Sequence, residues 1–201
     1  MGYLPKDESF FVSTNPIYTM IKTLRVILVL LALSAIGFVG YRYYNRYTAP
    51  SPPATAKFDN GQLSITVDYC QPSKKGRLIF GTEAEHALVP YGKWWRTGAN
   101  EATIITLNKD VTIGGKPLKA GSYTLFTTPQ QNEWLIMINS EVGQWGLSYN
   151  RDKDILRVPA QSAVKTDSEE KFTIDFLEQA KGAIMVLHWD TTEVLIPINS
   201  L

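Results

Sequence analysis

An uncharged apolar run near the N-terminus is the feature that most constrains this chain. Residues 26–40 read VILVLLALSAIGFVG, fifteen residues without a charge, and Leu24 and Tyr41 extend the run slightly past Arg25. A membrane-spanning helix needs about 20 apolar residues, with a lower limit near 17, whereas the apolar region of a signal peptide has roughly 7–15. The run lies between these lengths, so it predicts a segment that enters a membrane and leaves open whether it is cleaved.

The residues that follow the run favour a retained anchor. Aromatic and basic side chains come directly after it: Tyr41, Arg42, Tyr43, Tyr44, Arg46 and Tyr47. Tyrosine gathers at membrane–water interfaces, and no small-x-small cleavage site follows Gly40. We expect a transmembrane anchor at residues 21–44, behind a tail at residues 1–20. Because Met20 opens a basic and apolar stretch of its own, MIKTLRVILVL, residues 1–19 are either an upstream extension or precede the true start.

The membrane side of the remaining chain follows from the arrangement of the N-terminus. The positive-inside rule gives a tie, because three basic residues flank each side of the run: Lys6, Lys22 and Arg25, then Arg42, Arg46 and Lys57. A short tail before an apolar run is typical of an uncleaved export signal, so we expect the domain on the periplasmic or extracytoplasmic side, in the cell envelope. Residues 45–56 include three prolines and predict an extended linker.

Residues 57–201 predict one all-β domain. Apolar and polar residues alternate through residues 62–69, directly after an Asn60-Gly61 turn. Further strands are predicted at residues 102–107, 111–113, 122–127, 134–139, 155–158, 172–176, 183–189 and 194–198. The gaps are short, Gly114-Gly115 is typical of a type I′ hairpin turn, and only Glu178–Lys181 could close a helical turn. We expect an antiparallel β-sandwich, jelly-roll-like, with the doubly apolar Trp134–Ile138 as its central strand.

The charge balance argues against a nucleic-acid binder. The chain has 20 Lys and Arg against 19 Asp and Glu, and five of the basic residues but only two of the acidic ones lie in residues 1–54. The remaining 15 basic and 17 acidic residues give the β-domain a net charge of about −2. Binding to phosphate backbones needs a concentrated surplus of Lys and Arg, so we expect no nucleic-acid partner.

The densest group of chemically versatile side chains lies in the stretch PYGKWWRTGANEAT, residues 90–103. Tryptophan beside arginine, amide and carboxylate is typical of sugar and peptide sites, where the indole stacks and the polar groups orient the ligand. The candidate ligand-binding residues are Lys93, Trp95, Arg96, Asn100 and Glu101, together with Trp145 of the GQWG segment. In the competing interpretation, Trp95 plugs one end of the sandwich while Arg96 and Glu101 pair internally.

The same stretch resembles a bacterial family of unknown function, domain of unknown function 2911. The resemblance covers roughly residues 50–198 and also includes DYCQPSKKGRLIFG, DVTIGGKPLKAGSYTLFT, EWLIMIN, GQWG and VLHWDTTEVLIPI. It implies an exported or membrane-anchored β-rich domain and attaches no activity. Two departures stand out: TEAEHA, residues 82–87, intervenes between IFG and LVPYG, and the first strand ends in Cys70-Gln71 where the family has Ser-Arg.

Other chemistries have weaker support in the sequence. Glu83, Glu85 and His86 suggest a metal, but zinc needs three or four convergent ligands and the only other histidine, His188, reads as a packed strand residue. We therefore expect no metal and no cofactor.

No G-x-S-x-G elbow or phosphate-binding loop is present in the sequence. Cys70 reads as a small packed residue. The one basic run of the domain, Lys74-Lys75-Gly76-Arg77, is either a solvated loop, which we favour, or an anion site.

Three functions remain open. The first is a membrane-anchored binding or assembly module for an envelope glycan, peptide or protein. The second is a hydrolase that acts on an envelope glycan or peptide, in which Glu101 and a second carboxylate, Asp68 or Asp190, would stand about 5–10 Å apart across a cleft. The third is a structural subunit of a membrane complex. Exposure of Trp94 and Trp95 would favour binding, whereas complete burial would make the polar residues beside them internal braces.

Overall fold

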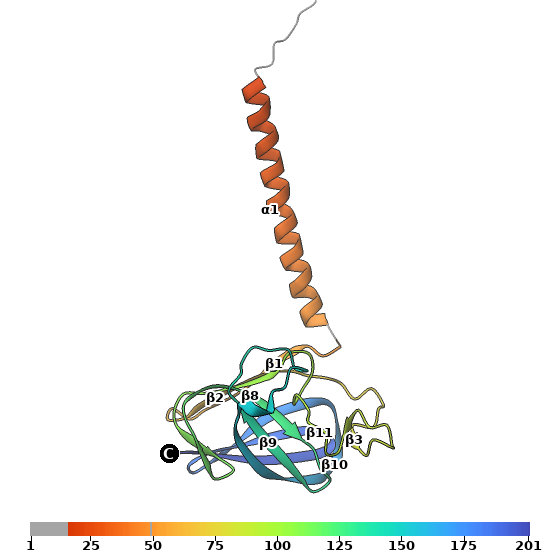
Figure 1. The fold of residues 1–201 in the computed structure, drawn as a ribbon, viewed down its shortest axis with the longest axis vertical. Coiled ribbons are helices and arrows are strands. Elements are labelled where there is room, and N and C mark those ends of the chain that lie inside the picture. The colour runs from red at the N-terminus through yellow and green to blue at the C-terminus, as the bar shows by residue number, and fades with distance from the viewer. Residues whose placement is uncertain (1–15, 49) are drawn as a thin grey trace, which may run out of the picture. The chain divides into compact units, whose positions relative to one another are not determined.

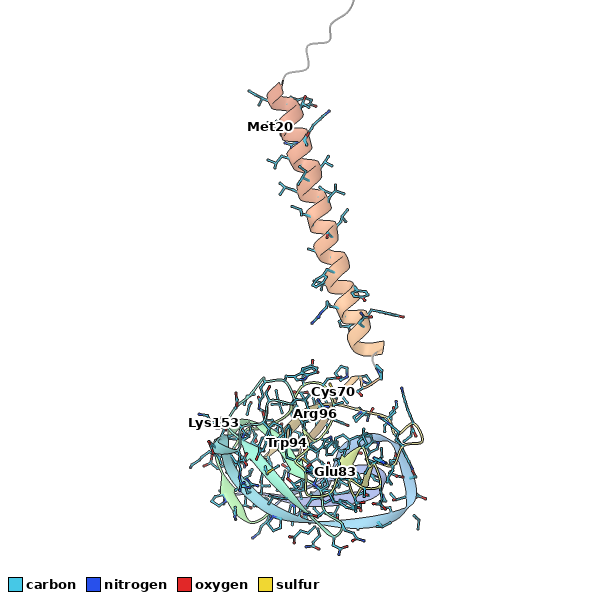
Figure 2. All side chains as sticks on the ribbon, turned by 45° about the vertical axis from the view of Figure 1, so that its right-hand side comes forward. Met20, Cys70, Glu83, Trp94, Arg96 and Lys153 are labelled. Carbon is cyan, nitrogen blue, oxygen red and sulfur yellow. The ribbon has the colours of Figure 1, made fainter. Side chains whose placement is uncertain are left out.

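The computed structural model describes residues 16–48 and 50–201, which form an N-terminal helix and a β-domain. Helix α1 spans Pro16–Thr48 (Figure 1), and the side chains of its residues 17–45 are exposed (Figure 2). Its segment Ile17–Asn45 has a mean hydropathy of 2.2 over its most apolar window. At 1.5 Å per residue it is about 44 Å long, enough to cross a hydrocarbon core of about 30 Å. The helix is therefore a candidate membrane anchor or signal sequence.

The helix contains the whole of the anchor that the sequence predicts, residues 21–44. Tyr41, Tyr43 and Tyr44 are exposed on it, as an interfacial belt requires. The side chains of Arg46 and Tyr47, and the first fifteen residues of the expected tail, lie outside the described residues.

The β-domain consists of a nine-stranded sheet and a two-stranded pair in the described residues. The strands are β1 Pro53–Asp59, β2 Ser64–Cys70, β3 Phe80–Gly81, β4 Val89–Pro90, β5 Thr103–Leu107, β6 Val111–Ile113, β7 Lys116–Leu118, β8 Gly121–Thr128, β9 Glu133–Asn139, β10 Asp154–Gln179 and β11 Gly182–Ser200. The large sheet has the order β1-β2-β5-β8-β9-β10-β11-β6-β7 and is antiparallel throughout, whereas β3 and β4 pair in parallel. A short 3-10 helix, Arg151–Lys153, precedes β10.

The sheet folds back on itself around a single main core (Figure 1). The start of β10 pairs with β9, and its later part pairs with β11. The late part of β10 packs against β1 and β2, at one end of the strand order. There the ring centroids of Phe176 and Phe58 of β1 are 6.0 Å apart, and Phe172 packs edge-on against Tyr69 of β2. The hydroxyl of Tyr69 also accepts a hydrogen bond from the backbone N–H of Ile174, at 3.1 Å. These contacts enclose the core between β1 and β2, at one end of the strand order, and the late part of β10.

The expected all-β antiparallel domain behind an apolar N-terminal helix is confirmed. Residues 134–138 lie in β9, the middle strand of the nine, as expected. A strand that is covered on both faces needs apolar residues at successive positions, which explains their run of apolar side chains. Gly114 and Gly115 join β6 to β7 as a hairpin. Their φ values of 54° and 82° are both positive, as a type I′ turn requires.

Three details differ from the sequence-based expectation. The predicted linker at residues 45–56 overlaps α1 at one end and β1 at the other, because β1 begins at Pro53 on the edge of the sheet, where proline is tolerated. Residues 178–181 form no helical turn, since β10 continues to Gln179 and turns directly into β11. The strands predicted at 155–158 and 172–176 are one strand, and so are those at 183–189 and 194–198.

Irregular pairing explains why the two long strands read as four short ones. The register shifts between Val164 and Glu169 and again between Glu169 and Thr173, and Asp190 opposite has a φ of 53°. Such bulges bend a strand and interrupt its alternation. The polar stretch of β10 therefore resembles a loop in sequence, while in the structure it is the bend between the two parts of the sheet.

Candidate functional site

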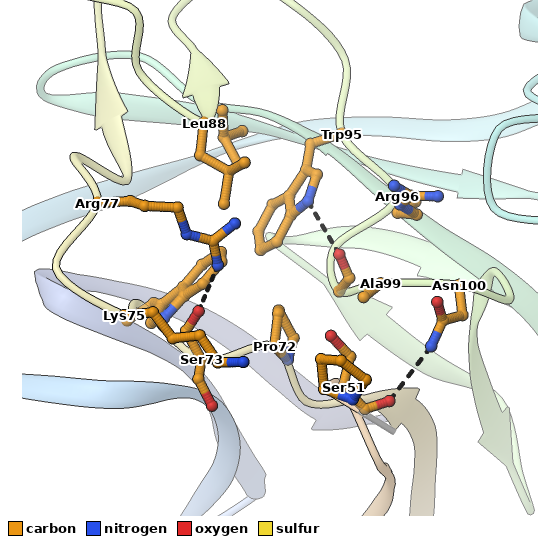
Figure 3. Close-up of a pocket in the computed structure, with 14 residues that line it drawn as sticks. Ser51, Pro72, Ser73, Lys75, Arg77, Leu88, Trp95, Arg96, Ala99 and Asn100 are labelled. Atoms are coloured by element: carbon orange, nitrogen blue, oxygen red, sulfur yellow. Dashed lines mark hydrogen bonds between the residues drawn. The ribbon is translucent and has the colours of Figure 1, made fainter. Parts of the chain in front are cut away.

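A pocket of about 370 Å³ lies where five separate parts of the β-domain meet (Figure 3). Its walls come from the chain before β1, the β2–β3 loop, β4, the loop at residues 95–100, and one residue of β11. The lining residues are Pro50, Ser51, Pro72, Ser73, Lys75, Arg77, Leu88, Val89, Trp95, Arg96, Gly98, Ala99, Asn100 and Trp189. The volume falls in the range of small-molecule sites.

The loop at residues 95–100 is held in a strained conformation. Thr97 has a φ of 53°, which is an outlier for a β-branched residue, and Asn100 has a φ of 55°. The Thr97 side chain is fully buried and its hydroxyl lies 3.1 Å from that of Thr127, while its carbonyl accepts a 2.7 Å hydrogen bond from Thr103. These bonds fix the loop, so the groups that it turns toward the pocket are preorganised.

Trp95 forms the apolar wall of the pocket. It is 8% exposed, its indole N–H donates to the carbonyl of Gly98 at 3.1 Å, and its ring stacks on Trp189 with centroids 5.8 Å apart. Phe80 and Phe172 pack against it edge-on, at 5.8 and 4.9 Å. Burial and aromatic contact therefore lock the ring in place.

Arg96 is half-buried beside Trp95, and the GQWG segment covers it. A Cβ on Gly146 would lie 2.5 Å from Cδ of Arg96 and 2.6 Å from the carbonyl oxygen of Asn100, so only glycine fits there. Burial lowers the pKa of the Arg96 guanidinium, because a charge loses solvation there. Among the described residues no carboxylate lies within ion-pair distance of it.

The opposite rim of the pocket is polar and basic. The side-chain amide of Asn100 donates to the carbonyl of Ser51 at 3.2 Å, which ties the chain before β1 to the loop (Figure 3). The Arg77 guanidinium donates to the carbonyls of Ser73 and Lys74, and Lys75 stands beside it.

The structure brings together three of the six predicted ligand-binding residues. Trp95, Arg96 and Asn100 line the pocket, whereas Lys93, Glu101 and Trp145 do not. Lys93 is exposed and pairs with Glu83 at 3.4 Å, and Trp145 is 52% exposed.

The two adjacent tryptophans are split in the same way. Trp95 is buried, while Trp94 is 40% exposed and packs on Phe126 and Tyr149, with centroids 5.9 and 5.1 Å apart. Exposure of both residues would favour binding, and burial of both a structural role. One is exposed and the other is buried, so the pair satisfies neither condition.

The carboxylates proposed for hydrolysis are each engaged elsewhere. The Cys70 thiol donates to Glu101 at 3.2 Å, Thr55 donates to Asp68 at 2.6 Å, and Lys74 pairs with Asp190 at 2.6 Å. Burial, and then the hydrogen bond to Glu101, raise the pKa of the Cys70 thiol, so it is a poor nucleophile at neutral pH.

The part of the chain that the structure describes contains no cluster of metal-ligating residues. Glu85 of the TEAEHA segment accepts hydrogen bonds from the backbone and hydroxyl of Thr82, which makes the segment a capped turn. The segment therefore has a structural explanation that needs no metal.

Sequence reasoning missed the pocket residues that come from other segments. Ser51 precedes the first strand, Leu88 follows the TEAEHA segment, and Trp189 lies about ninety positions after Trp95. The basic run at residues 74–77 was the available signal. Lys75 and Arg77 line the pocket, while Lys74 turns away to Asp190.

Comparison with known proteins gives one family. The comparisons with curated proteins and with solved structures gave no match. The model of the family described as "Protein of unknown function (DUF2911)" matches residues 51–198, which includes nearly the whole β-domain and every pocket residue except Pro50. The chain therefore belongs to the DUF2911 family.

Proposed function

We propose that this protein is a membrane-anchored binding module that holds a small ligand, or a group of an envelope glycan or peptide, in the pocket beside Trp95. One observation supports this above the others: a strained loop, held by hydrogen bonds at Thr97, brings an aromatic, an arginine and an asparagine residue to the lining of one cavity. Strain in the backbone persists where surrounding contacts enforce it, and such places are often binding sites.

Helix α1 supports the proposed location. Helix α1 is retained in the membrane and places the β-domain on the extracytoplasmic side, in the cell envelope. Its length, its hydropathy and its exposed tyrosines support retention.

The hydrolase alternative has less support. None of the fourteen residues that line the pocket is acidic, and the three carboxylates considered for it have other partners. Hydrolysis of a glycosidic bond needs two carboxyl groups facing the substrate. A purely structural role would not account for the pocket. The burial of Trp95 supports a contribution of this residue to stability in addition to binding.

The test is to fill the pocket in the full chain, held in detergent or nanodiscs. Ala99→Trp puts an indole into the cavity, and Ala84→Trp on the exposed turn at residues 82–87 is the matched control. Chitooligosaccharides, short peptides and small organic anions serve as probes, with tryptophan fluorescence as the readout because Trp95 and Trp189 line the pocket.

We expect one probe class to bind the wild type and the control, and to bind Ala99→Trp at least about tenfold more weakly, a difference of about 1.4 kcal/mol. If Ala99→Trp fails to fold, Ala99→Leu provides a smaller obstruction. Binding that is equal in the wild type and in a folded, filled variant contradicts the proposal.

A further inference from the structure

Every charged residue that lines the pocket is cationic. Lys75, Arg77 and Arg96 line it, and no acidic residue does. The domain as a whole has more acidic than basic residues, so this local surplus of three positive charges runs against the composition of its surroundings. A cavity lined by one sign of charge concentrates ligands of the opposite sign.

Two acidic groups beside the basic loop, Asp190 and Glu170, are already bound by other partners. Asp190 accepts from Lys74 and from the hydroxyl of Ser168, at 2.6 and 2.7 Å. One carboxylate oxygen of Glu170 accepts the backbone N–H of Lys75 at 2.9 Å. Neither residue lines the pocket, so neither takes the place of an anion inside it.

Two of the three cations keep hydrogen-bonding capacity for a ligand. Arg77 uses one N–H of Nε and one of Nη2 on backbone carbonyls, which leaves three of its five donors. Arg96 is partly desolvated and has no carboxylate within ion-pair distance in the described chain. A buried charge without a counter-charge is costly, and an incoming anion would offset that cost.

Apolar side chains form a further part of the lining, beside the neutral polar residues Ser51, Ser73 and Asn100. Trp95, Trp189, Leu88, Val89 and two prolines share the pocket with the cations, and its volume of about 370 Å³ exceeds what a lone phosphate needs. Guanidinium groups bind phosphate and carboxylate oxygens through paired N–H donors, while indole faces bind flat apolar groups.

We propose that the ligand is an amphiphilic anion, with a phosphate or carboxylate group held by Arg77, Arg96 and Lys75 and a compact apolar part against Trp95 and Trp189. This inference rests on the proposed binding function and names its ligand class. The same chemistry is available from two sources, the headgroup region of an anionic lipid and a soluble organic phosphate or carboxylate.

The experiment measures binding of phenyl phosphate, benzoate and phenol to the full chain in phosphatidylcholine nanodiscs by calorimetry. Arg96→Gln and Arg77→Gln are the test variants. Arg151→Gln is the matched control because Arg151 is exposed and lies outside the pocket, and Lys93→Gln removes a charge that neighbours the loop but does not line the pocket.

We expect phenyl phosphate or benzoate to bind and phenol to bind at least tenfold more weakly. Each test variant should lower the affinity for the anion roughly ten- to hundredfold, and each control should change it less than twofold. Affinity should also fall as salt concentration rises.

Repeating the titration in nanodiscs that contain phosphatidylglycerol separates the sources, because a bound headgroup would compete with phenyl phosphate in the wild type. Competition assigns the site to a lipid, and its absence assigns it to a soluble anion; both outcomes support the proposal.

Failure of this inference can be told apart from failure of the proposed function. If phenol or another neutral probe binds as tightly as the anions, and Ala99→Trp blocks it, the binding function stands and the anionic ligand class is wrong. If anions bind but neither arginine variant weakens them, the anion lies elsewhere and the inference is overturned. If no probe binds the folded wild type, both proposals are contradicted.

Discussion

Trp94 and Trp95 are neighbours in the chain, but they stabilise opposite faces of the sheet by different means. The backbone of Trp95 exchanges two hydrogen bonds with Thr127 of β8, so consecutive side chains point to opposite sides. Trp95 enters the main core among four other aromatic rings. Trp94 lies on the outer face, over the small cluster that contains Phe126 and Tyr149.

The outer cluster depends on polar contacts far more than the inner one does. Tyr149 donates to Asp154 at 2.6 Å, and the same carboxylate accepts from Arg157 and Asn139, at 3.1 and 2.9 Å. The Asp154 side chain is only 3% exposed. Aromatic burial therefore supports the pocket from inside, while a hydrogen-bond network on the outer face holds the chain that follows the covering loop, residues 143–146.

Truncating the two tryptophans should give the largest and most unequal effect. Trp95→Ala removes a buried ring that touches four others, so we expect a loss of about 3–5 kcal/mol in the free energy of unfolding. Trp94→Ala removes a ring that is 40% exposed, so about 1 kcal/mol is expected. Chemical denaturation of the full chain in detergent measures both. Equal losses would remove the distinction between the faces.

A methyl group on Gly146, in the loop that covers Arg96, should disturb the pocket. Gly146→Ala forces a shift of Arg96 or of the Asn100 backbone, with an expected cost of about 1–3 kcal/mol and weaker binding of phenyl phosphate. Gly143→Ala is the control in the same loop: its φ of 86° disfavours alanine, but no atom lies within 4 Å of the added Cβ. The control should leave binding unchanged, and a similar loss of binding in both variants would contradict this prediction.

Removing the Tyr149 hydroxyl should cost about 1–2 kcal/mol, because the bond it makes is to a carboxylate. Burial, and then the hydrogen bond to Asp154, raise the pKa of Tyr149 from 10.0 to about 12. Its folded-state pKa is above the unfolded value, so this stability is fully present below pH 10 and is lost as the pH rises toward 12. Denaturation midpoints should therefore fall more steeply between pH 10 and 12 in the wild type than in Tyr149→Phe. Parallel curves would mean that the network does not shift this group.

Glu101→Gln should have the smallest effect. Glu101 is exposed and outside the pocket, so stability should change by less than about 0.5 kcal/mol and ligand affinity should not change. The Cys70 thiol should react faster with a thiol reagent at mildly alkaline pH, since the neighbouring carboxylate helps to raise its pKa. Glu141→Gln, on another exposed glutamate, should leave that rate unchanged. A loss of affinity as large as that of Arg96→Gln would place Glu101 in the site.

Local patterns predicted the apolar helix, the alternating strands and the central position of residues 134–138, because each depends on neighbours in the chain. The long strands β10 and β11 were not predictable, since their bulged middle parts are polar and lose the period of two. The pocket was only half predictable: Trp95, Arg96 and Asn100 lie in one unusual stretch, but Ser51, Arg77 and Trp189 reach it through tertiary folding. No periodic pattern in the sequence indicates that these segments come together in the fold.

The sheet order also determines when this domain can complete its folding. The hairpin of β6 and β7 joins the large sheet only through the last residues of β11, where Ile198 pairs with Ile113 and Ser200 with Val111. Those partners are separated by more than eighty positions, and such long-range pairings form slowly. During synthesis, the hairpin must therefore wait until residues 198–200 have emerged. A domain built in this way is exposed to proteases and to aggregation until β11 is available.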